Sequence, residues 1–475
     1  MASWSWGATL LVFLCFSGCG GELITKLPGQ PKNVGFKQYS GYTVTDAGHG
    51  RALFYYFVEA DSADPLSRPL TVWFNGGPGC SSFGVGAFME NGPFQVGEKG
   101  QLLRNEFSWN LESNVLYAES PIGVGFSYSN TSTDYINWND TRTADENLIF
   151  ITNWLEEFPM YKDSDLFLIG ESYAGHYIPQ LTALILEHNK RPNIRPINLK
   201  SIALGNPLLD FDISIRADDY LWAHGAISDE TLSLERTVCN DSTYMRLNVH
   251  GRRSQGCDYV FSRVSDEIGA DVDHDDLLLP KCLSSSSPQF RPLGLHGKIH
   301  VAIARRANIG DPCLPARIFT YLNRPDVQKA LHANTTHLPY LWHSCSGPLQ
   351  YQQDNLDMNI IPLVLDILKE GIPILLFSGD QDSLIPLTQT RTIANILAKD
   401  AKLLTLNKYG PWYDGKQVGG WSQSFGEERD GKNVTALTYA TVRGAAHEVP
   451  FSSPSQALTL FVSFLKGSAL PRPHA

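Results

Sequence analysis

Short runs of apolar residues, most of them ending at turn residues, recur along the chain. Runs of this length are typical of buried parallel strands. They predict strands at Leu70–Phe74, Asn114–Ala118, Leu166–Ile169, Ser201–Leu204, Pro373–Phe377 and Leu437–Val442. Apolar residues spaced three and four apart predict helices at Ala144–Phe158, Tyr173–Glu187 and Gln456–Leu465. The alternation predicts the α/β class, with a central, mostly parallel sheet covered by helices.

This alternation stops between residues 211 and 330. The region holds a helix-like stretch, Ile227–Val238, and four of the cysteines. We interpret 211–330 as an insertion, a helical cap over the carboxyl edge of the sheet. It separates a first part of the core, 22–210, from a second part, 331–475. Residues 284–298 mix Ser, Pro and Gly, which predicts an exposed loop that can be cleaved and excised.

The first 21 residues contain no charged side chain. An apolar run from Ala8 to Phe16 is followed by small residues, so residues 1–21 are predicted to be a signal peptide. A buried N-terminal strand is the alternative, and the absence of Lys or Arg before the run departs from the usual leader. No other stretch is long and apolar enough to span a bilayer.

Charge and cysteine content indicate which partners and which cellular compartment suit the protein. The net charge is −11 and no Lys/Arg cluster is present, which argues against nucleic acid as a partner. Two of the eight cysteines lie in the predicted leader, and the remaining six suit three disulfides in an oxidising compartment. There is no C-x-x-C pair, so neither a zinc site nor a redox motif is predicted. Glycosylation is predicted at the five N-x-S/T sequons, at Asn130, Asn139, Asn240, Asn334 and Asn433.

A candidate nucleophile lies in the segment 166–175, Leu-Phe-Leu-Ile-Gly-Glu-Ser-Tyr-Ala-Gly. The segment predicts a strand, a sharp turn and a helix start, which is the context of a nucleophile elbow. The turn would place the hydroxyl of Ser172 at a helix N-terminus, where backbone N–H groups stabilise developing negative charge. The strict G-x-S-x-G pattern is not met because Ala174 replaces the second Gly, but a small residue still allows close packing.

A Gly-rich turn, 75–79, follows the predicted strand Leu70–Phe74. Acyl transfer needs two N–H donors at the oxyanion position. We expect one from Tyr173, directly after the nucleophile, and the other from Gly77. An ordinary tight turn and a phosphate cradle are alternatives. Neither a P-loop Lys nor the Rossmann glycine spacing is present, and no cofactor is predicted.

The acid and the base are expected after Ser172, in that order. His447 follows the strand Leu437–Val442, and both Asp380 and Asp382 follow the strand that ends at Phe377. His447 would take the proton of Ser172 and return it to the leaving amine, while an Asp holds the imidazole tautomer. Chemistry alone does not choose between the two aspartates.

The chain resembles the serine carboxypeptidases, and most closely their plant members. The matching segments span nearly the whole mature chain in family order: 27–29, 39–42, 75–82, 119–128, 170–179, 379–382 and 446–450. The resemblance implies an α/β-hydrolase fold and assigns the triad acid to Asp382. One departure is Ala445–Ala446, where Gly is usual just before the His.

The resemblance also implies how such an enzyme recognises the free α-carboxylate of a peptide. Asn75 and the N–H of Gly76 match the family's hydrogen-bond donors, and Glu90 and Glu171 match two Glu that share a proton. Two carboxyls in contact cannot both ionise cheaply, so one pKa rises and the protonated group donates to the substrate. Binding is then favoured below neutral pH. Without the resemblance, Glu90 reads as a solvated charge at a helix end.

Disulfides, location and partners follow from the same resemblance. The family pattern pairs Cys80 with Cys345, Cys239 with Cys257, and Cys282 with Cys313. The last pair encloses the Ser-rich loop, so cleavage there would leave two chains joined by the bridge. The implied protein is a secreted or vacuolar serine carboxypeptidase that acts at acidic pH on the C-termini of peptides and proteins, with no membrane partner. Relatives are often dimers, so a homodimer is consistent with the resemblance.

Two other functions are alternatives. Some plant relatives use the same triad to transfer acyl groups from glucose esters, and they tend to carry Asp at the position of Glu171. Glu171 and Ala174 therefore favour hydrolysis. A non-catalytic scaffold is the third reading, and the complete set of catalytic residues argues against it.

Overall fold

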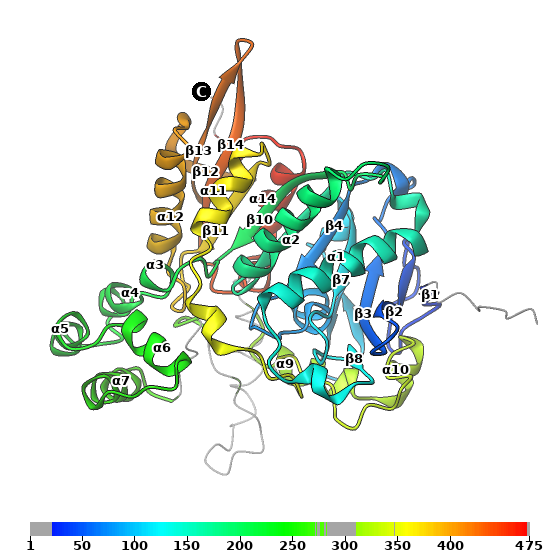
Figure 1. The fold of residues 1–475 in the computed structure, drawn as a ribbon, viewed down its shortest axis with the longest axis horizontal. Coiled ribbons are helices and arrows are strands. Elements are labelled where there is room, and N and C mark those ends of the chain that lie inside the picture. The colour runs from blue at the N-terminus through cyan, green and yellow to red at the C-terminus, as the bar shows by residue number, and fades with distance from the viewer. Residues whose placement is uncertain are drawn as a thin grey trace, which may run out of the picture.

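The computed structural model describes residues 21–270, 272, 276–279, 282, 310–345 and 347–472. Within these residues, twelve strands form one sheet in the order β1-β2-β3-β7-β4-β9-β10-β11-β14-β13-β12, with β8 beside β3 (Figure 1). The strands of this sheet are β1 (Glu22–Leu23), β2 (Gln38–Asp46), β3 (Arg51–Val58), β4 (Leu70–Phe74), β7 (Asn114–Ala118), β8 (Tyr128–Ser129), β9 (Leu166–Glu171), β10 (Leu199–Gly205), β11 (Ile374–Gly379), β12 (Leu404–Asp414), β13 (Gln417–Arg429) and β14 (Lys432–Val442). A separate small sheet pairs β5 (Phe94–Val96) with β6 (Leu102–Arg104).

The centre of the large sheet is parallel. The neighbours from β7 to β14 in the sheet order pair in parallel, and β1, β2 and β3 at one end and β13 and β12 at the other pair antiparallel. β4, β7, β9 and β11 are buried along their whole length, as continuous apolar runs predict. The predicted α/β class with a central, mostly parallel sheet is confirmed. All parallel strands end at one edge, which brings the loops after β4, β9, β11 and β14 together.

Helices cover both faces of this sheet. α1, α2, α11 and α12 share one hydrophobic core with one face, and α9, α13 and α14 share a second core with the other (Figure 1). The helices are α1 (Asp140–Glu157), α2 (Ala174–Asn189), α3 (Phe211–Ser214), α4 (Asp218–Ala223), α5 (Asp229–Thr237), α6 (Asp241–Val249), α7 (Gln255–Ile268), α9 (Leu314–Leu322), α10 (Pro325–Ala330), α11 (Ile361–Lys369), α12 (Leu387–Asp400), α13 (Val449–Ser452) and α14 (Pro454–Leu465).

The region between residues 211 and 330 divides in two. Helices α4 to α7 form a group to one side of the sheet, with small apolar clusters of their own (Figure 1). Helices α9 and α10 instead contribute to the core of the main body. The boundaries proposed for a cap at 211–330 stay a prediction. The loop 284–298 lies outside the described residues.

Most predicted elements agree with the structure, but the strands at the two edges of the sheet were not predicted. β4 and β7 have the predicted bounds, and β9, β10 and β14 are longer than predicted. β2, β3, β12 and β13, which extend the sheet at its two ends, were not predicted. The predicted signal peptide lies outside the described residues except for Gly21. Over the described ranges, no helix is both long and apolar enough to cross a bilayer.

Candidate active site

Ser172 lies at the sharp turn between β9 and α2. Its φ is 60°, in the left-handed region that residues with a Cβ rarely adopt. Such a conformation costs about 1–3 kcal/mol and persists where neighbours fix it. The N–H of Ser172 donates to the carbonyl of Gly205 at 2.9 Å, and its carbonyl accepts from the N–H of Leu208 at 3.0 Å. The sequence between strand and helix thus forms the predicted elbow.

The Gly-rich turn after β4 packs directly against this elbow. A Cβ on Gly76 would lie 2.3 Å from the backbone N of Tyr173 and 2.9 Å from Cβ of Ser172, so only Gly fits there. Gly77 has a φ of 114°, which also requires Gly, and it is exposed while Gly76 is buried. The two segments predicted to supply oxyanion donors therefore meet beside Ser172.

His447 and Asp382 come together at the same edge of the sheet. Nδ1 of His447 lies 2.9 Å from Oδ2 of Asp382, and both side chains are buried. With the proton on Nδ1, the imidazole donates to the carboxylate and leaves Nε2 to accept a proton. Asp380 points elsewhere, because its Oδ1 accepts from the N–H of Gly444 at 2.7 Å. The geometry therefore separates the two aspartates that the sequence left open.

Asp382 is held by three further groups. Its Oδ1 accepts from the N–H groups of Leu384 and Ile385, at 2.7 and 3.0 Å. Its Oδ2 also accepts from Nδ2 of Asn206, whose own Oδ1 accepts from the N–H of Gly379. Asn206 was not predicted from the sequence. The signal available was a polar side chain directly after β10, at the carboxyl edge of the sheet.

Two buried glutamates lie next to the nucleophile and share one donor. Nδ2 of Asn75 donates to Oε1 of Glu90 and to Oε1 of Glu171, at 2.8 Å each. Oδ1 of Asn75 accepts from Nε1 of Trp73 at 2.7 Å, which fixes the orientation of the amide. The Oε2 atoms of both glutamates are buried and accept no hydrogen bond from other side chains in the described part of the chain, and the two carboxyls are close enough to share a proton with each other.

Electrostatics favour a proton on this pair. Burial raises the pKa of Glu90 to about 8, and the charge of Glu448 adds to the shift. Burial also raises the pKa of Glu171 well above its usual value, and the charge of Glu90 adds to that shift. A neutral carboxyl with a free oxygen can donate a hydrogen bond to an anion. A protonated pair of this kind, one member of which directly precedes Ser172 in the chain, can bind a carboxylate.

Comparisons with known proteins identify the family. A family model described as serine carboxypeptidase matches residues 28–467. The chain belongs to the serine carboxypeptidase family. Serine carboxypeptidase-like 46 of Arabidopsis thaliana is 47% identical over 456 residues, which cover 95% of this chain and 93% of the relative. Serine carboxypeptidase 24 of the same plant is 41% identical over 458 residues, with 95% and 94% covered.

A solved structure agrees in fold. Kex1(delta)p, a prohormone-processing carboxypeptidase from Saccharomyces cerevisiae, matches with a TM-score of 0.68 at 20% identity, covering 91% of each chain. The resemblance to the serine carboxypeptidases, the α/β-hydrolase fold and the enzyme class, a serine-type carboxypeptidase hydrolase, are confirmed.

The disulfides of this serine carboxypeptidase are the three that the family pattern implies. Cys80 bonds to Cys345, Cys239 to Cys257 and Cys282 to Cys313. The first joins the end of the Gly-rich turn to a segment 265 residues further along the chain. Beside it, the buried carboxylate of Glu119 accepts from Ser81 and from Nε1 of Trp342, so both segments at this bridge are held by side chains as well.

The five sequons differ in how free their side chains are. Asn130 and Asn433 are exposed. The side-chain oxygens of Asn139 and Asn240 cap α1 and α6. Nδ2 of Asn334, the atom that would carry a glycan, donates to Gln328 at 3.0 Å. The arrangement favours Asn130 and Asn433 as modification sites, and glycosylation stays a prediction.

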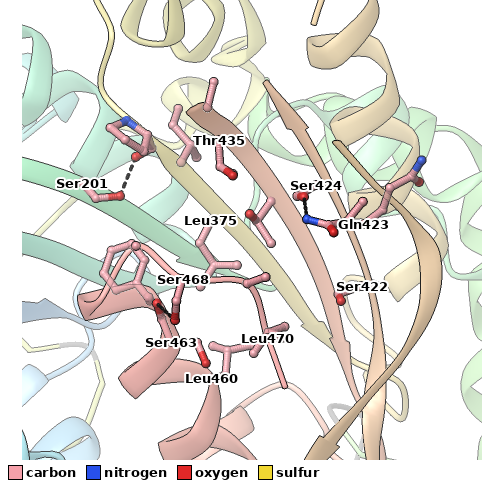
Figure 2. Close-up of a pocket in the computed structure, with 18 of the residues that line it drawn as sticks. Ser201, Leu375, Ser422, Gln423, Ser424, Thr435, Leu460, Ser463, Ser468 and Leu470 are labelled. Atoms are coloured by element: carbon pink, nitrogen blue, oxygen red, sulfur yellow. Dashed lines mark hydrogen bonds between the residues drawn. The ribbon is translucent and has the colours of Figure 1, made fainter. Parts of the chain in front are cut away.

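A cavity of about 360 Å³ lies apart from this site (Figure 2). Its lining includes Ser201, Leu375, Ser422, Thr435, Leu460 and Leu470. These residues come from the early parts of β10 and β11, from β13 and β14, and from α14 and the chain after it. The cavity is therefore at the amino ends of the parallel strands, and Ser172, Asp382 and His447 follow their carboxyl ends. No residue of the proposed catalytic or carboxylate-binding set lines it.

Proposed function

We propose that this enzyme is a serine carboxypeptidase that releases the C-terminal residue from peptides and proteins. The observation that carries the proposal is the Asn75-bridged pair of Glu90 and Glu171, buried beside Ser172. A site for an endopeptidase or an esterase needs no carboxyl pair at this point. A protonated pair suits the one feature that all peptide C-termini share, a free α-carboxylate next to the last peptide bond.

The proposed reaction uses the groups around Ser172. His447 removes the proton of Ser172, whose oxygen attacks the carbonyl carbon of the last peptide bond. Asp382 orients the imidazole and stabilises its charged form. The N–H groups of Gly77 and Tyr173 stabilise the oxyanion. His447 then protonates the leaving amino acid, and water releases the acyl group by the same steps in reverse order.

Carboxylate binding sets the side of the peptide that is cut. The N–H of Gly76 and the pair of Glu90 and Glu171 hold the α-carboxylate, Asn75 holds the two glutamates in place, and the pair must keep at least one proton to do so. Because burial raises the pKa of both carboxyls, the protonated form persists well above the usual range of Glu. The pair is fully protonated in acid, which supports a role at acidic pH.

The same proposal extends to location. Three disulfides suit folding in an oxidising compartment, which supports the secretory route to the vacuole or the cell exterior. The predicted leader and the exposed sequons at Asn130 and Asn433 agree with that route. A homodimer stays a prediction from the resemblance.

A substrate pair tests the proposal. An N-blocked dipeptide acid and the matching dipeptide amide are incubated with the purified protein at pH 5, and release of the C-terminal residue is measured. We expect the acid to be cleaved at least about 30-fold more efficiently, the value of one charge-assisted hydrogen bond of about 2 kcal/mol. Ser172→Ala should lose about 10⁶ in kcat with its fold intact. Equal cleavage of acid and amide, or a tenth of the activity left in Ser172→Ala, would contradict the proposal.

A further inference from the structure

A second buried carboxylate lies behind the elbow and is used by none of the steps above. Asp140 is the first residue of α1 and is 1% exposed. Its two oxygens accept four side-chain hydrogen bonds: from Oη of Tyr173 at 2.8 Å and Oη of Tyr351 at 2.6 Å to Oδ1, and from Nδ1 of His176 and Nε2 of Gln180, both at 2.9 Å, to Oδ2. A buried carboxylate is tolerated when its lone pairs are satisfied in this way.

The donors connect this carboxylate to the residue after the nucleophile. Tyr173 directly follows Ser172, and His176 and Gln180 lie on the first turns of α2. Tyr351 comes from the second half of the chain. The ring of Tyr173 stacks on His176 with centroids 4.5 Å apart and contacts Tyr351 edge-on at 5.9 Å. The whole side chain of Tyr173 is therefore fixed by contacts from three separate segments.

The buried side chain of Asp140 is ionised. Burial by itself raises the pKa of Asp140, but the hydrogen bond and charge of His176 and the bonds from the two tyrosines outweigh it, so the pKa lies below its usual value. The hydrogen bond from Tyr173 is then charge-assisted, and such bonds are shorter and stronger than neutral ones.

We propose that Asp140 is a positioning residue for the oxyanion hole: through the side chain of Tyr173 it fixes the backbone N–H of Tyr173 relative to Ser172. The inference rests on the proposed function, in which that N–H is an oxyanion donor. Ser172 has a strained left-handed backbone, and such strain persists only where neighbouring residues are held in place. Removal of an oxyanion donor costs about 10² to 10³ in rate, and a shift of about 1 Å can cost about 10².

The first test compares two hydroxyl groups that donate to the same carboxylate oxygen. Tyr173→Phe and Tyr351→Phe each remove one donor from Oδ1 of Asp140, but only the first releases the residue that carries the oxyanion N–H. We expect kcat to fall about 10-fold in Tyr173→Phe, part of the full value of the donor, with KM within about 2-fold. Tyr351→Phe should keep kcat within about 3-fold. Equal losses in the two variants would overturn the inference.

The second test compares two buried carboxylates on one helix. Asp140→Asn removes the charge behind Tyr173. Glu146→Gln makes the same carboxyl-to-amide change in a buried side chain that contacts Thr45, Arg51 and the N–H of Ile122 instead. The readout is the rate of acetylation by 4-nitrophenyl acetate, which needs the oxyanion hole but no peptide carboxylate. We expect Asp140→Asn to react about 30-fold more slowly and Glu146→Gln within about 2-fold of the wild type.

These readouts keep the two proposals apart. A wild type that is acetylated but cleaves no peptide acid would contradict the proposed carboxypeptidase, while the variants' acetylation rates would still decide the role of Asp140. A wild type that is not acetylated would contradict both. Acetylation of Asp140→Asn at the wild-type rate would overturn the positioning role alone. If Asp140→Asn does not fold, the two Phe variants decide the question.

Discussion

Replacement of both Glu90 and Glu171 by Gln should remove the pH dependence of carboxylate binding. Asn75 already gives both of its side-chain protons to the pair, so a substrate carboxylate must obtain its proton from a neutral Oε2. Both pKa values are raised, so the pair keeps a proton in acid and loses it as pH rises through the raised value, about 8 for Glu90. Gln keeps an N–H donor at every pH.

The expected change in KM follows from two consequences of ionisation. Ionisation removes a charge-assisted hydrogen bond of about 1.5–3 kcal/mol and adds repulsion between like charges in a buried site. A total of about 2–4 kcal/mol corresponds to roughly 30- to 1,000-fold in KM for a peptide acid. The peptide amide carries no charge, so its KM should change little. His447 acts on both substrates by the same steps, so the acid-to-amide ratio of kcat/KM separates carboxylate binding from effects of pH on the triad.

The assay measures this ratio from pH 5 to 9. In the wild type we expect it to stay level in acid and to fall as pH rises through about 8, the raised pKa of Glu90. In the double Gln variant it should be level throughout. Glu146→Gln is the control, because burial also raises the pKa of Glu146, to about 7, while its contacts are with Thr45, Arg51 and Ile122. A wild-type ratio that is level, or one that falls equally in the double variant, would refute the assignment.

Two further predictions concern the triad acid and the helices α4 to α7. Asp382→Asn should lower kcat by about 10⁴, because Oδ2 of Asp382 lies 2.9 Å from Nδ1 of His447. Asp380→Asn should lower kcat less than tenfold, because Oδ1 of Asp380 accepts from the N–H of Gly444 instead; the opposite ranking in steady-state kinetics would contradict this. Burial, with the charges of nearby aspartates, raises the pKa of Glu235 to about 8, above its unfolded value near 4.3, so its stabilising effect is present in acid and lost as pH rises through that range. Glu235→Gln should therefore raise the free energy of unfolding by about 1–3 kcal/mol at pH 8 and little at pH 5, and an equal thermal shift at both pH values would contradict the reasoning.

The centre of the fold could be predicted from local sequence, and the periphery could not. β4 and β7 are continuous apolar runs between turns, so their residue types alone predict burial on both faces. β12 carries exposed residues on both faces and has several register shifts with β13, so no clean two-residue alternation marks it. Edge strands of this kind depend on neighbours that a local pattern does not contain.

The same limit applies to the site. Ser172 and His447 could be found because each follows a predicted strand, in an order that the chemistry requires. Asp140 was not predicted to have a role, because it precedes the helix predicted from Ala144 and is an ordinary acidic residue in the sequence. Its burial depends on residues as distant as Tyr351, and distant contacts of this kind are a property of the folded chain.

The order of strands in the sheet also decides when the enzyme can become active. Ser172 and its oxyanion segments lie in the first half of the chain, but His447 follows β14, which is inserted between β11 and β13. During synthesis the N-terminal part is available to fold first. On the proposed mechanism, a growing or half-folded chain therefore has a nucleophile but no base. Proteolytic capacity appears only when the last strand is in place, which protects other newly made proteins while this one is still folding.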